Sequence, residues 1–315
     1  MNFSVVICTH NRAGQLENAL ISLCTQNYPK NHFEILVVDN NSTDSTKSTI
    51  LNLSKIYKGV KIRYLFEKKQ GISFSSNHAL KHVKFNQVVF FDDDEIAPPD
   101  LLNNYYQVWY KHKSPKLAIV GGQILPKYLP AETRIKHSQL KDAVDDWVLG
   151  IINPGKKTAF LKFPEVLYSG NFCINKNIIL KEGGFNEKLS MKRKYSYIHG
   201  TDIDLCFRMY FRGYQILYSP QIKVWHIITP MRFNARFLIR RYFCSGIEMQ
   251  YIERKFLGKE AGVNYLKYFI KIIIIDVVRL ILLRKPKNKF LDYVYGTSYS
   301  LQTILSLIGV PFLKN

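Results

Sequence analysis

One segment of the chain sets four apolar residues directly before four acidic ones, Val88-Val89-Phe90-Phe91-Asp92-Asp93-Asp94-Glu95. The apolar run predicts a buried strand, and carboxylates this crowded repel one another unless a cation neutralises them. Side chains alternate along an extended chain, so Asp92 and Asp94 are expected on one side, where their oxygens suit a magnesium or manganese ion. A second interpretation is that these acids are solvated and cap a helix that begins near Pro98-Pro99.

Further apolar runs of this kind precede and follow the segment, and amphipathic helical patterns lie between them. Because strands that alternate with helices form βαβ units, the first 120 residues predict an α/β fold with a mostly parallel central sheet. Runs without polar alternation are typical of strands that helices cover on both faces. The expected strands are Phe3–Cys8, Phe33–Val38, Val60–Leu65, Val88–Phe91 and Leu117–Val120.

Polar residues follow three of these strands at the point where each strand ends. Thr9-His10-Asn11-Arg12 follows the first strand, Asp39-Asn40-Asn41-Ser42 the second, and Asp92-Asp93-Asp94 the fourth. The carboxyl ends of parallel strands meet at one edge of a sheet, where ligands of such folds bind, so these residues are expected to converge. The helix predicted after Asp39 has three N-cap candidates: Ser42, Thr43 and Asp44.

The charge of the chain is strongly positive and unevenly spread. The 315 residues carry a formal net charge of +21, and residues 232–289 alone hold 14 Lys and Arg against four Asp and Glu. Such an excess predicts a polyanionic partner such as nucleic acid, anionic lipid or a phosphorylated substrate. The five cysteines are scattered and never spaced as C-x-x-C, and no signal peptide is recognised, so we expect residence in the reducing cytoplasm.

Four sequence matches carry a resemblance to a known family. They are the segments 5–12 and 37–44, Gln70-Gly71-Ile72-Ser73 with Asn77, and the pair Asp92 and Asp94. Over about residues 3–230 the chain resembles a family 2 glycosyltransferase of the GT-A fold. The resemblance implies a nucleotide-diphosphate sugar donor, a D-x-D metal motif and inversion at the anomeric carbon. The implied donor-binding residues are Thr9, His10, Asn11, Arg12, Asp39, Gln70, Gly71, Asn77, Asp92 and Asp93. An arginine often found before the asparagine is here Ser76.

The resemblance continues into the acceptor half. Tyr168-Ser169-Gly170-Asn171-Phe172 and Gly183-Gly184-Phe185-Asn186-Glu187 resemble segments that floor the sugar and acceptor site, which implies Gly170, Asn171 and Gly184 as contacts. Gly200-Thr201-Asp202 resembles the acidic segment that holds the catalytic base. The resemblance implies Asp202 as that base, with Thr201 beside it where the family has an acid. Asp202 is alternatively a helix N-cap.

One more residue completes the expected chemistry. His226 follows Val224-Trp225 at the end of a strand, and the resemblance implies that it joins Asp92 and Asp94 as a metal ligand; a structural histidine is the alternative. Asp204 and Arg208, four residues apart on a helix expected over Asp202–Arg212, predict an ion pair. Strands are expected over Val166–Ile174, Ile216–Tyr218 and Ile222–Trp225.

The domain prediction divides the chain near residue 230. Residues 1–230 are expected to form the GT-A catalytic domain, Rossmann-like, with a nucleotide-sugar half (1–122) and an acceptor half (123–230). Residues 231–315 are expected to form a basic, amphipathic helical extension with helices over Arg232–Lys255, Val263–Leu283 and a last segment to Leu313. An apolar arc on the second helix and the cations Arg284, Lys285, Lys287 and Lys289 indicate a lipid-surface helix. The alternative is that these helices cover the catalytic domain.

The sequence thus predicts an inverting, metal-dependent glycosyltransferase. Its expected donor is a UDP-sugar, and its expected acceptor is a hydroxyl on a glycan or a polyprenyl-linked carrier in cell-surface polysaccharide or glycolipid synthesis. We expect a divalent cofactor, manganese or magnesium, an anionic membrane surface as partner, and no nucleic acid. Two rival interpretations are a sugar nucleotidyltransferase and a non-enzymatic basic protein that binds membranes or nucleic acid. The first lacks a good glycine- and basic-rich triphosphate loop, and the second leaves the acidic strand end unexplained.

Overall fold

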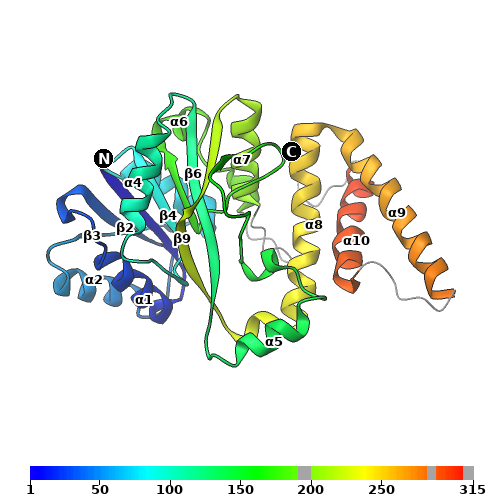
Figure 1. The fold of residues 1–315 in the computed structure, drawn as a ribbon, viewed down its shortest axis with the longest axis horizontal. Helices are drawn as coiled ribbons and strands as arrows, with labels where there is room; N and C mark the ends of the chain where they lie inside the picture. Colours follow the sequence, from blue (N-terminus) through cyan, green and yellow to red (C-terminus); the bar gives the residue numbers. More distant parts are fainter. Residues whose placement is uncertain (191–199, 282–288, 308–315) are drawn as a thin grey trace. The chain divides into compact units, whose positions relative to one another are not determined.

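A computed structural model describes residues 1–190, 200–281 and 289–307 of the chain. The chain forms two compact units (Figure 1). The first unit comprises the described residues of Met1–Lys127, Gly150–Lys192 and Thr201–Ile227, and the second those of Tyr128–Leu149, Arg193–Gly200 and Ile228–Asn315. The second unit therefore includes residues 128–149, which lie in the expected acceptor half, together with the C-terminal helices.

The first unit is built on a mixed sheet that begins with four parallel strands. These are β1 (Phe3–Thr9), β2 (Phe33–Asp39), β3 (Lys61–Phe66) and β4 (Gln87–Phe91), in the order β3-β2-β1-β4. Their register places Thr9 beside Asp39, so the ends of β1 and β2 coincide. The predicted α/β fold and these four strands are confirmed, and β1, β2 and β4 are almost entirely buried, as expected for largely apolar strands covered on both faces.

The later strands extend the sheet with antiparallel pairs. They are β5 (Glu95–Ile96), β6 (Leu117–Tyr128), β7 (Ala159–Phe160), β8 (Asn171–Asn175) and β9 (Gln215–Ile228). Strand β8 pairs antiparallel with both β4 and β6, and β9 pairs antiparallel with β5 and β7. The fifth predicted strand is therefore longer than expected and lies beyond β8, outside the parallel set.

Two predicted strand boundaries in this region were wrong. The strand expected from Val166 begins only at Asn171, because a turn at Ser169-Gly170 precedes it. The two short strands expected around Ile216–Trp225 are one continuous strand, β9, that runs through Pro220. A proline is tolerated in a strand where its missing N–H is not needed by a neighbour.

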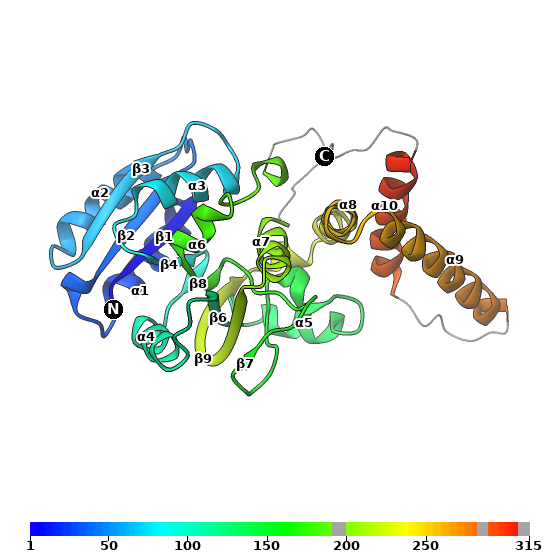
Figure 2. The ribbon, with the colours of Figure 1, turned by 90° about the horizontal axis from the view of Figure 1, so that it is seen from above.

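Helices cover both faces of this sheet and create two cores. Helices α1 (Ala13–Cys24), α2 (Thr46–Ile56) and α4 (Leu101–Lys111) pack on one face, and α3 (Ile72–His82), α6 (Lys176–Lys181) and α7 (Thr201–Phe211) on the other. Strand β1 shows the alternation: Val5 and Ile7 belong to the first core and Val6 to the second. Figure 2 shows α3 and α4 on opposite sides of the parallel strands. Two 3-10 turns, η1 (Lys30–His32) and η3 (Glu187–Leu189), complete the unit.

The second unit is helical. It contains α5 (Thr133–Leu140), α8 (Ala235–Leu257), α9 (Lys259–Ile281) and α10 (Phe290–Leu307), with the 3-10 turns η2 (Asp146–Leu149) and η4 (Pro230–Phe233). The helices expected after Met231 are thus present; the ends predicted at Leu283 and Leu313 lie outside the described residues. Glycines allow close packing: Gly246 of α8 lies against Ser298, and Gly296 of α10 lies against the ring of Phe269.

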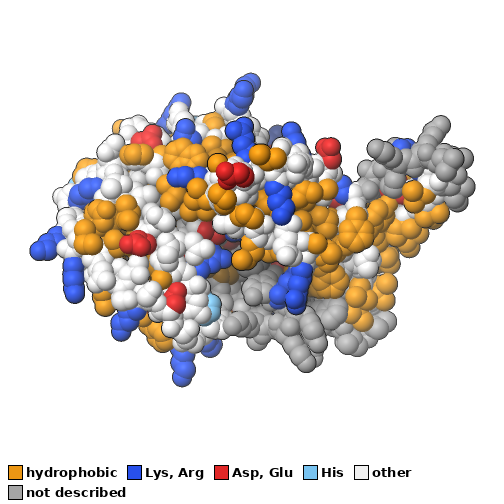
Figure 3. Space-filling view, turned by 90° about the horizontal axis from the view of Figure 1, so that it is seen from below, with side chains coloured by type: hydrophobic (Ala, Val, Ile, Leu, Met, Phe, Trp, Pro, Cys, Tyr) orange, Lys and Arg blue, Asp and Glu red, His pale blue; other side chains and the backbone are white. Residues whose placement is uncertain are grey.

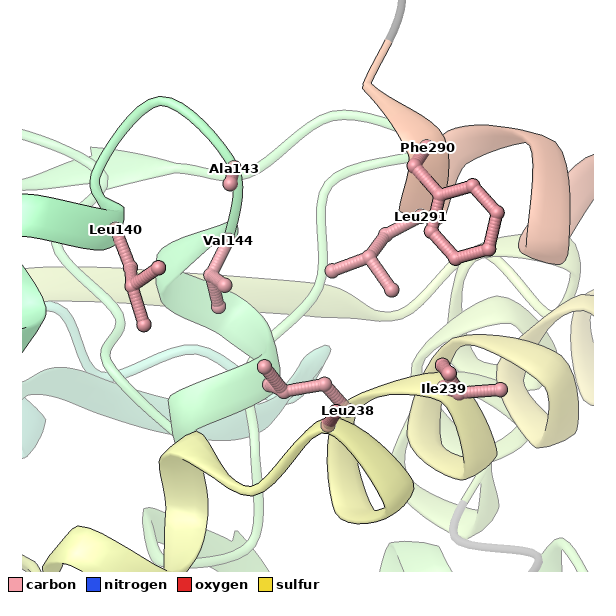
Figure 4. A pocket seen from close by; sticks show the side chains of 8 residues that line it. Leu140, Ala143, Val144, Leu238, Ile239, Phe290 and Leu291 are labelled. Carbon is pink, nitrogen blue, oxygen red and sulfur yellow. The ribbon is translucent and has the colours of Figure 1, made fainter.

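An apolar pocket of about 240 Å³ lies inside this second unit. Figure 4 shows its side chains, which come from three stretches far apart in the sequence. They are Leu140, Ala143, Val144, Ala235, Leu238, Ile239, Phe290 and Leu291. None of the helices within residues 1–190, 200–281 and 289–307 has the length and apolar character needed to cross a membrane.

Candidate active site

Two interlocked loops follow β1 and β2. Asn11 and Asn41 both adopt positive φ angles, +52° and +65°, a conformation that asparagine tolerates better than most residues. The backbone N–H of Asn11 donates to the hydroxyl of Ser42 (3.0 Å), and the backbone N–H of Thr43 donates to Oδ1 of Asn11 (2.7 Å). These bonds fix the first polar segment against the second at the end of the sheet.

The helix after Asp39 begins later than the sequence suggested. Helix α2 starts at Thr46 with Ser45 as its N-cap residue, and Ser45 makes no side-chain capping bond. The prediction that Ser42, Thr43 or Asp44 caps this helix was wrong. Asp44 instead accepts hydrogen bonds from the backbone N–H groups of Thr46 (3.0 Å) and Ala13 (3.1 Å), which joins the two loops a second time.

Asp39 is buried at the end of β2 with both carboxylate oxygens engaged. Oδ1 accepts from the backbone N–H of Ser42 (2.8 Å), and Oδ2 accepts from the hydroxyl of Tyr64 (3.0 Å). Burial, and then the bond to Asp39, raise the pKa of Tyr64 to about 12. The aromatic ring of Tyr64 therefore stands beside Asp39, the predicted base or ribose contact, although no sequence pattern indicates this neighbour.

The segment before α3 is held by Asn40, another residue that sequence reasoning missed. Its Oδ1 accepts from the backbone N–H of Gly71 (2.7 Å), and its Nδ2 donates to the carbonyls of Glu67 and Lys69. Gly71 has a φ of +143°, which a residue with a Cβ rarely adopts. The predicted donor residues His10 and Gln70 lie side by side, with their Nε2 atoms 3.5 Å apart.

The acidic residues after β4 form a turn. The backbone N–H of Glu95 donates to the carbonyl of Asp92 (3.3 Å), so the chain is not extended here and the alternation argument for Asp92 and Asp94 was wrong. Asp92 is exposed, whereas Asp93, Asp94 and Glu95 are buried. The chain turns here, and β5, which follows at once, pairs antiparallel with β9. We call residues 92–95 the acid turn.

Cation and hydroxyl groups from the β1 loop reach the acid turn. The hydroxyl of Thr9 donates to Oδ2 of Asp93 (2.7 Å). One guanidinium nitrogen of Arg12, Nη1, contacts both Oδ1 of Asp93 (2.7 Å) and Oδ2 of Asp94 (3.1 Å). The predicted convergence of the polar segments at one edge of the sheet is thus seen in these contacts.

The acid turn is electrostatically crowded. The pKa of Asp92 is raised to about 8, first because surrounding protein removes water from its carboxyl group, although the residue keeps an exposed surface, and then because neighbouring carboxylates repel its charge. Those neighbours are Asp94, Asp93 and Asp202. Burial raises the pKa of Glu95 well above its ordinary value. Such a cluster favours a bound cation.

His226 reaches the same turn from β9. It pairs with Glu95 across the β5–β9 ladder, and its Nε2 lies 3.4 Å from Oδ2 of Asp94. The backbone N–H of Ile227 donates to the carbonyl of Asp94 (2.9 Å). Gly150 packs on the imidazole so closely that a Cβ there would lie 2.9 Å from Cε1. His226 and Asp94, which were expected to bind the same metal ion, therefore lie close together.

The side chains of the acid turn and His226 are of the types that bind divalent ions. Carboxylate oxygen and imidazole nitrogen are ordinary manganese and magnesium ligands, and the guanidinium on Asp93 and Asp94 shows that this place accepts a cation. No three acidic, histidine or cysteine side chains within the described parts of the chain are arranged as a ready metal site. Asp94 instead contacts Arg12 and His226.

Asp202 lies in the first turn of α7, not at its N-cap. Helix α7 begins at Thr201, and Oδ2 of Asp202 accepts from both the backbone N–H and the hydroxyl of Ser169 (3.1 Å each). Asp202 is close enough to Asp92 to raise its pKa. The N-cap alternative for Asp202 was therefore wrong. The predicted pair of Asp204 with Arg208 is confirmed at 3.4 Å.

Gly170 lies directly against the acid turn. A Cβ on Gly170 would lie 3.1 Å from Oδ2 of Asp92 and would also press on the carboxyl group of Glu95. Ser169, the preceding residue, is the partner of Asp202. The segment that resembles the sugar and acceptor floor thus connects Asp202 with the acid turn.

Two predicted site residues, Asn171 and Asn77, are engaged in supporting bonds. Asn171 is 1% exposed, donates to the carbonyl of Gln123 and accepts from the hydroxyl of Tyr105. Direct contact of this amide with an acceptor is not favoured, because burial and two partners hold it below the surface. Asn77 bonds the backbone N–H and carbonyl of Phe185.

Gly184 lies beside that bond, with a φ of +71° and an added Cβ 2.6 Å from Oδ1 of Asn77. Asn77 and Gly184 together shape the loop before η3. Thr201, the remaining acceptor-side prediction, is 3% exposed, and its hydroxyl donates to Oδ1 of Asp202 (3.4 Å).

Comparisons with solved structures agree with this fold. A mannosyltransferase from Pyrobaculum calidifontis, solved with GDP-mannose and Mn²⁺, has a TM-score of 0.56 and 18% identity, and the likeness covers 98% of this chain and 72% of that one. TarS 1–349 from Staphylococcus aureus, solved with UDP, has a TM-score of 0.53 and 20% identity, over 82% and 71% of the two chains.

Curated relatives are glycosyltransferases. A poly(ribitol-phosphate) beta-glucosyltransferase of Bacillus spizizenii is 25% identical over 207 residues, 63% of this chain and 32% of the relative. TarS of Staphylococcus aureus, a poly(ribitol-phosphate) beta-N-acetylglucosaminyltransferase, is 31% identical over 183 residues, 54% and 30% of the two chains. The aligned parts span about a third of these relatives. The sequence model of Glycosyl transferase family 2 matches residues 4–182, more than half of the chain, so this protein belongs to that family.

Proposed function

We propose that the protein is an inverting glycosyltransferase that moves a sugar from a nucleotide-diphosphate sugar, a UDP-sugar, to a hydroxyl group of an acceptor. The observation that carries this proposal is the acid turn. It meets Thr9 and Arg12 from the β1 loop, His226 from β9 and the Ser169-Gly170 turn that holds Asp202. In this proposal the donor site and the base both lie at this edge of the sheet.

In this proposal Asp202 removes the proton of the attacking hydroxyl. Two hydrogen bonds from Ser169 orient one oxygen of its carboxylate, and its charge lies close enough to the acid turn to act on Asp92. General-base help of this kind contributes about 10²–10⁴-fold in rate. Direct attack on the anomeric carbon, with no enzyme nucleophile, inverts its configuration.

Donor binding is assigned to the interlocked loops. We propose that Asp39 and Tyr64 border the base or ribose, while His10 and Gln70 line the other side of the donor. Asp92, Asp94 and His226 would hold a manganese or magnesium ion. Such an ion neutralises charge on the departing diphosphate when bound.

We propose a lipid-linked or membrane-proximal acceptor in cell-surface glycan synthesis. One relative, 37% identical over 92 residues (29% of each chain), is a GalNAc(5)-diNAcBac-PP-undecaprenol beta-1,3-glucosyltransferase of Campylobacter jejuni. The two poly(ribitol-phosphate) relatives also act on phosphate-bearing acceptors by name. In this proposal residues 1–230 are the catalytic domain, and residues 231–315 attach the enzyme peripherally to the cytoplasmic face of a membrane.

Helix α9 supports the membrane part of the proposal through three distinct faces. One face packs inward through Tyr265, Phe269 and Asp276. A second is mixed, with Asn264, Lys267 and Lys271 exposed beside Tyr268 and Ile275. The third is apolar at helical spacing and remains open, with exposed fractions of 49, 38, 48 and 56% at Ile270, Ile273, Val277 and Leu280.

An open apolar face bordered by lysines is what an interfacial helix presents to anionic lipid. In Figure 3 apolar side chains gather over the part of the molecule that carries the C-terminal helices. The apolar pocket of Figure 4 belongs to the same unit.

A thermal-shift screen tests the donor assignment. UDP-, GDP- and dTDP-sugars are compared with and without manganese, because a ligand that binds the native state raises the melting temperature. We expect the largest rise with a UDP-sugar and manganese together. The anomeric configuration of the product, read by proton NMR, tests inversion, and a product that retains the donor configuration contradicts it.

A further inference from the structure

The contact between Arg12 and the acid turn has an unusual form. A single nitrogen, Nη1, bridges Asp93 and Asp94 at 2.7 and 3.1 Å. The Asp94 oxygen that it contacts, Oδ2, also lies 3.4 Å from Nε2 of His226. The guanidinium therefore stands at the oxygen that the proposed metal site would use.

The two ends of this contact differ in freedom. Asp93 is held by Thr9, and Asp94 is anchored through its carbonyl to β9; their side chains are 6 and 10% exposed. The Arg12 side chain is 45% exposed and extends from the loop before α1. The carboxylates are thus fixed, while the guanidinium can turn toward solvent or toward a ligand at the rim.

A guanidinium and a divalent cation cannot share one carboxylate oxygen without strong repulsion. A metal ion that binds alone must displace Arg12 and leave its charge without a partner at the site. A diphosphate changes this balance, because arginine binds phosphate oxygens with two parallel N–H donors.

We propose that Arg12 is an internal counter-cation that occupies Asp94 until the donor diphosphate draws it away, so that metal and donor bind cooperatively. The inference rests on the proposed metal and donor sites and adds a coupling between them. Arg12 is a positioning residue in this scheme: it neutralises the acid turn in the empty enzyme and the diphosphate in the loaded one. Coupling of this kind is reciprocal, so the metal raises the affinity for the nucleotide by the same factor.

The test measures Mn²⁺ binding to the full chain by electron paramagnetic resonance, with and without UDP. For the unaltered protein we expect UDP to raise Mn²⁺ affinity within the ~5–150-fold range usual for coupled sites. Arg12→Gln should bind Mn²⁺ more tightly without UDP, because its competitor is gone, and should lose most of the coupling. Lys55→Gln is the matched control: it removes an exposed cation in the last turn of α2, and its Mn²⁺ binding should be unchanged with and without UDP.

Arg12→Lys provides a second measurement if the glutamine variant does not fold. Lysine keeps a competing charge but lacks the two-donor fork, so Mn²⁺ affinity without UDP should stay near normal while the coupling falls. Unchanged coupling in both variants, or weaker Mn²⁺ binding by Arg12→Gln without UDP, would overturn the role of Arg12. Absence of Mn²⁺ binding to any of these proteins, with or without UDP, would overturn the metal site of the proposed function as well.

Discussion

At the scale of single residues, two buried aspartates on one helix turn have different partners. Asp202 faces Ser169 and the acid turn, whereas Asp204 is fully buried and bonded to Arg208 and Asn186. Asp204 is held by two structural partners and stabilises the fold, whereas Asp202 lies close enough to the acid turn to act on Asp92 and is the proposed base. The pair therefore offers an internal comparison.

Asp202→Asn should lower the transfer rate by about 10²–10⁴-fold, because the amide cannot accept the acceptor proton. Its melting temperature and its UDP affinity should stay near those of the unaltered protein. Asp204→Asn should do the reverse and destabilise the protein by about 1–3 kcal/mol, because the half-buried Arg208 loses its charged partner. Turnover and thermal unfolding of both variants measure this, and near-normal transfer by Asp202→Asn would remove Asp202 from the role of base.

Gly170 permits the close approach of the acceptor segment to the acid turn. Gly170→Ala should weaken donor binding at least several-fold, because the new Cβ presses on the carboxyl groups of Asp92 and Glu95. Gly14→Ala is the matched control, since a Cβ there meets nothing within 4 Å in helix α1. Calorimetric titration with UDP and manganese measures both, and equal affinities would show that the turn tolerates the added group.

At the scale of elements, the predictable features were those that depend on local pattern. Unbroken apolar runs gave β1, β2 and β4 to within about a residue, because buried parallel strands carry no polar alternation. The acid turn was misjudged, since its reversal depends on β9 pairing with β5 more than a hundred residues later. No local pattern encodes such a partner.

In the candidate active site, too, some contacts could be predicted from the sequence and others could not. The sequence predicted that four residues would lie near one another, because the strand ends of a parallel sheet coincide. They are Thr9, Arg12, Asp93 and Asp94. The supporting bonds of Asn40 and Asn171 could not be predicted, because an asparagine in a loop or strand gives no sign of which distant backbone group it will bond.

Helix α9 is the element on which membrane attachment depends. Val277→Glu should weaken binding to anionic vesicles markedly, because a charge on the open apolar face must be desolvated to enter lipid. Ile56→Glu is the matched control, with an isoleucine that is 70% exposed on α2 in the other unit. Vesicle flotation of the two variants measures the difference. Equal flotation would mean that α9 does not touch the membrane.

At the scale of the whole molecule, the division into units follows contacts and not sequence order. Residues 128–149 join the C-terminal helices, and Asp145 bonds both Tyr242 and Lys289. Removing everything after Met231 would expose Leu140 and Val144, which face Leu238 and Leu291 in the apolar pocket. Membrane attachment is therefore best tested on the full chain, by changing the salt concentration and the lipid composition of the vesicles.

The charge of the chain gives a prediction that belongs to the molecule as a whole. With a net charge of +21, and 14 cations against four acids in residues 232–289, each cation near an anionic surface contributes about 1 kcal/mol of attraction. The full-length protein should float with vesicles that contain phosphatidylglycerol at low salt. Binding should fall as salt shortens the screening distance from about 30 Å at 0.01 M to about 8 Å at 0.15 M, but should not vanish, because the open face of α9 adds an apolar contribution that salt does not screen. Vesicles of phosphatidylcholine alone should bind less at every salt concentration. If the protein stays in the soluble fraction with anionic vesicles at low salt, the helices of the second unit serve the fold alone, and the acceptor must be sought among soluble glycans.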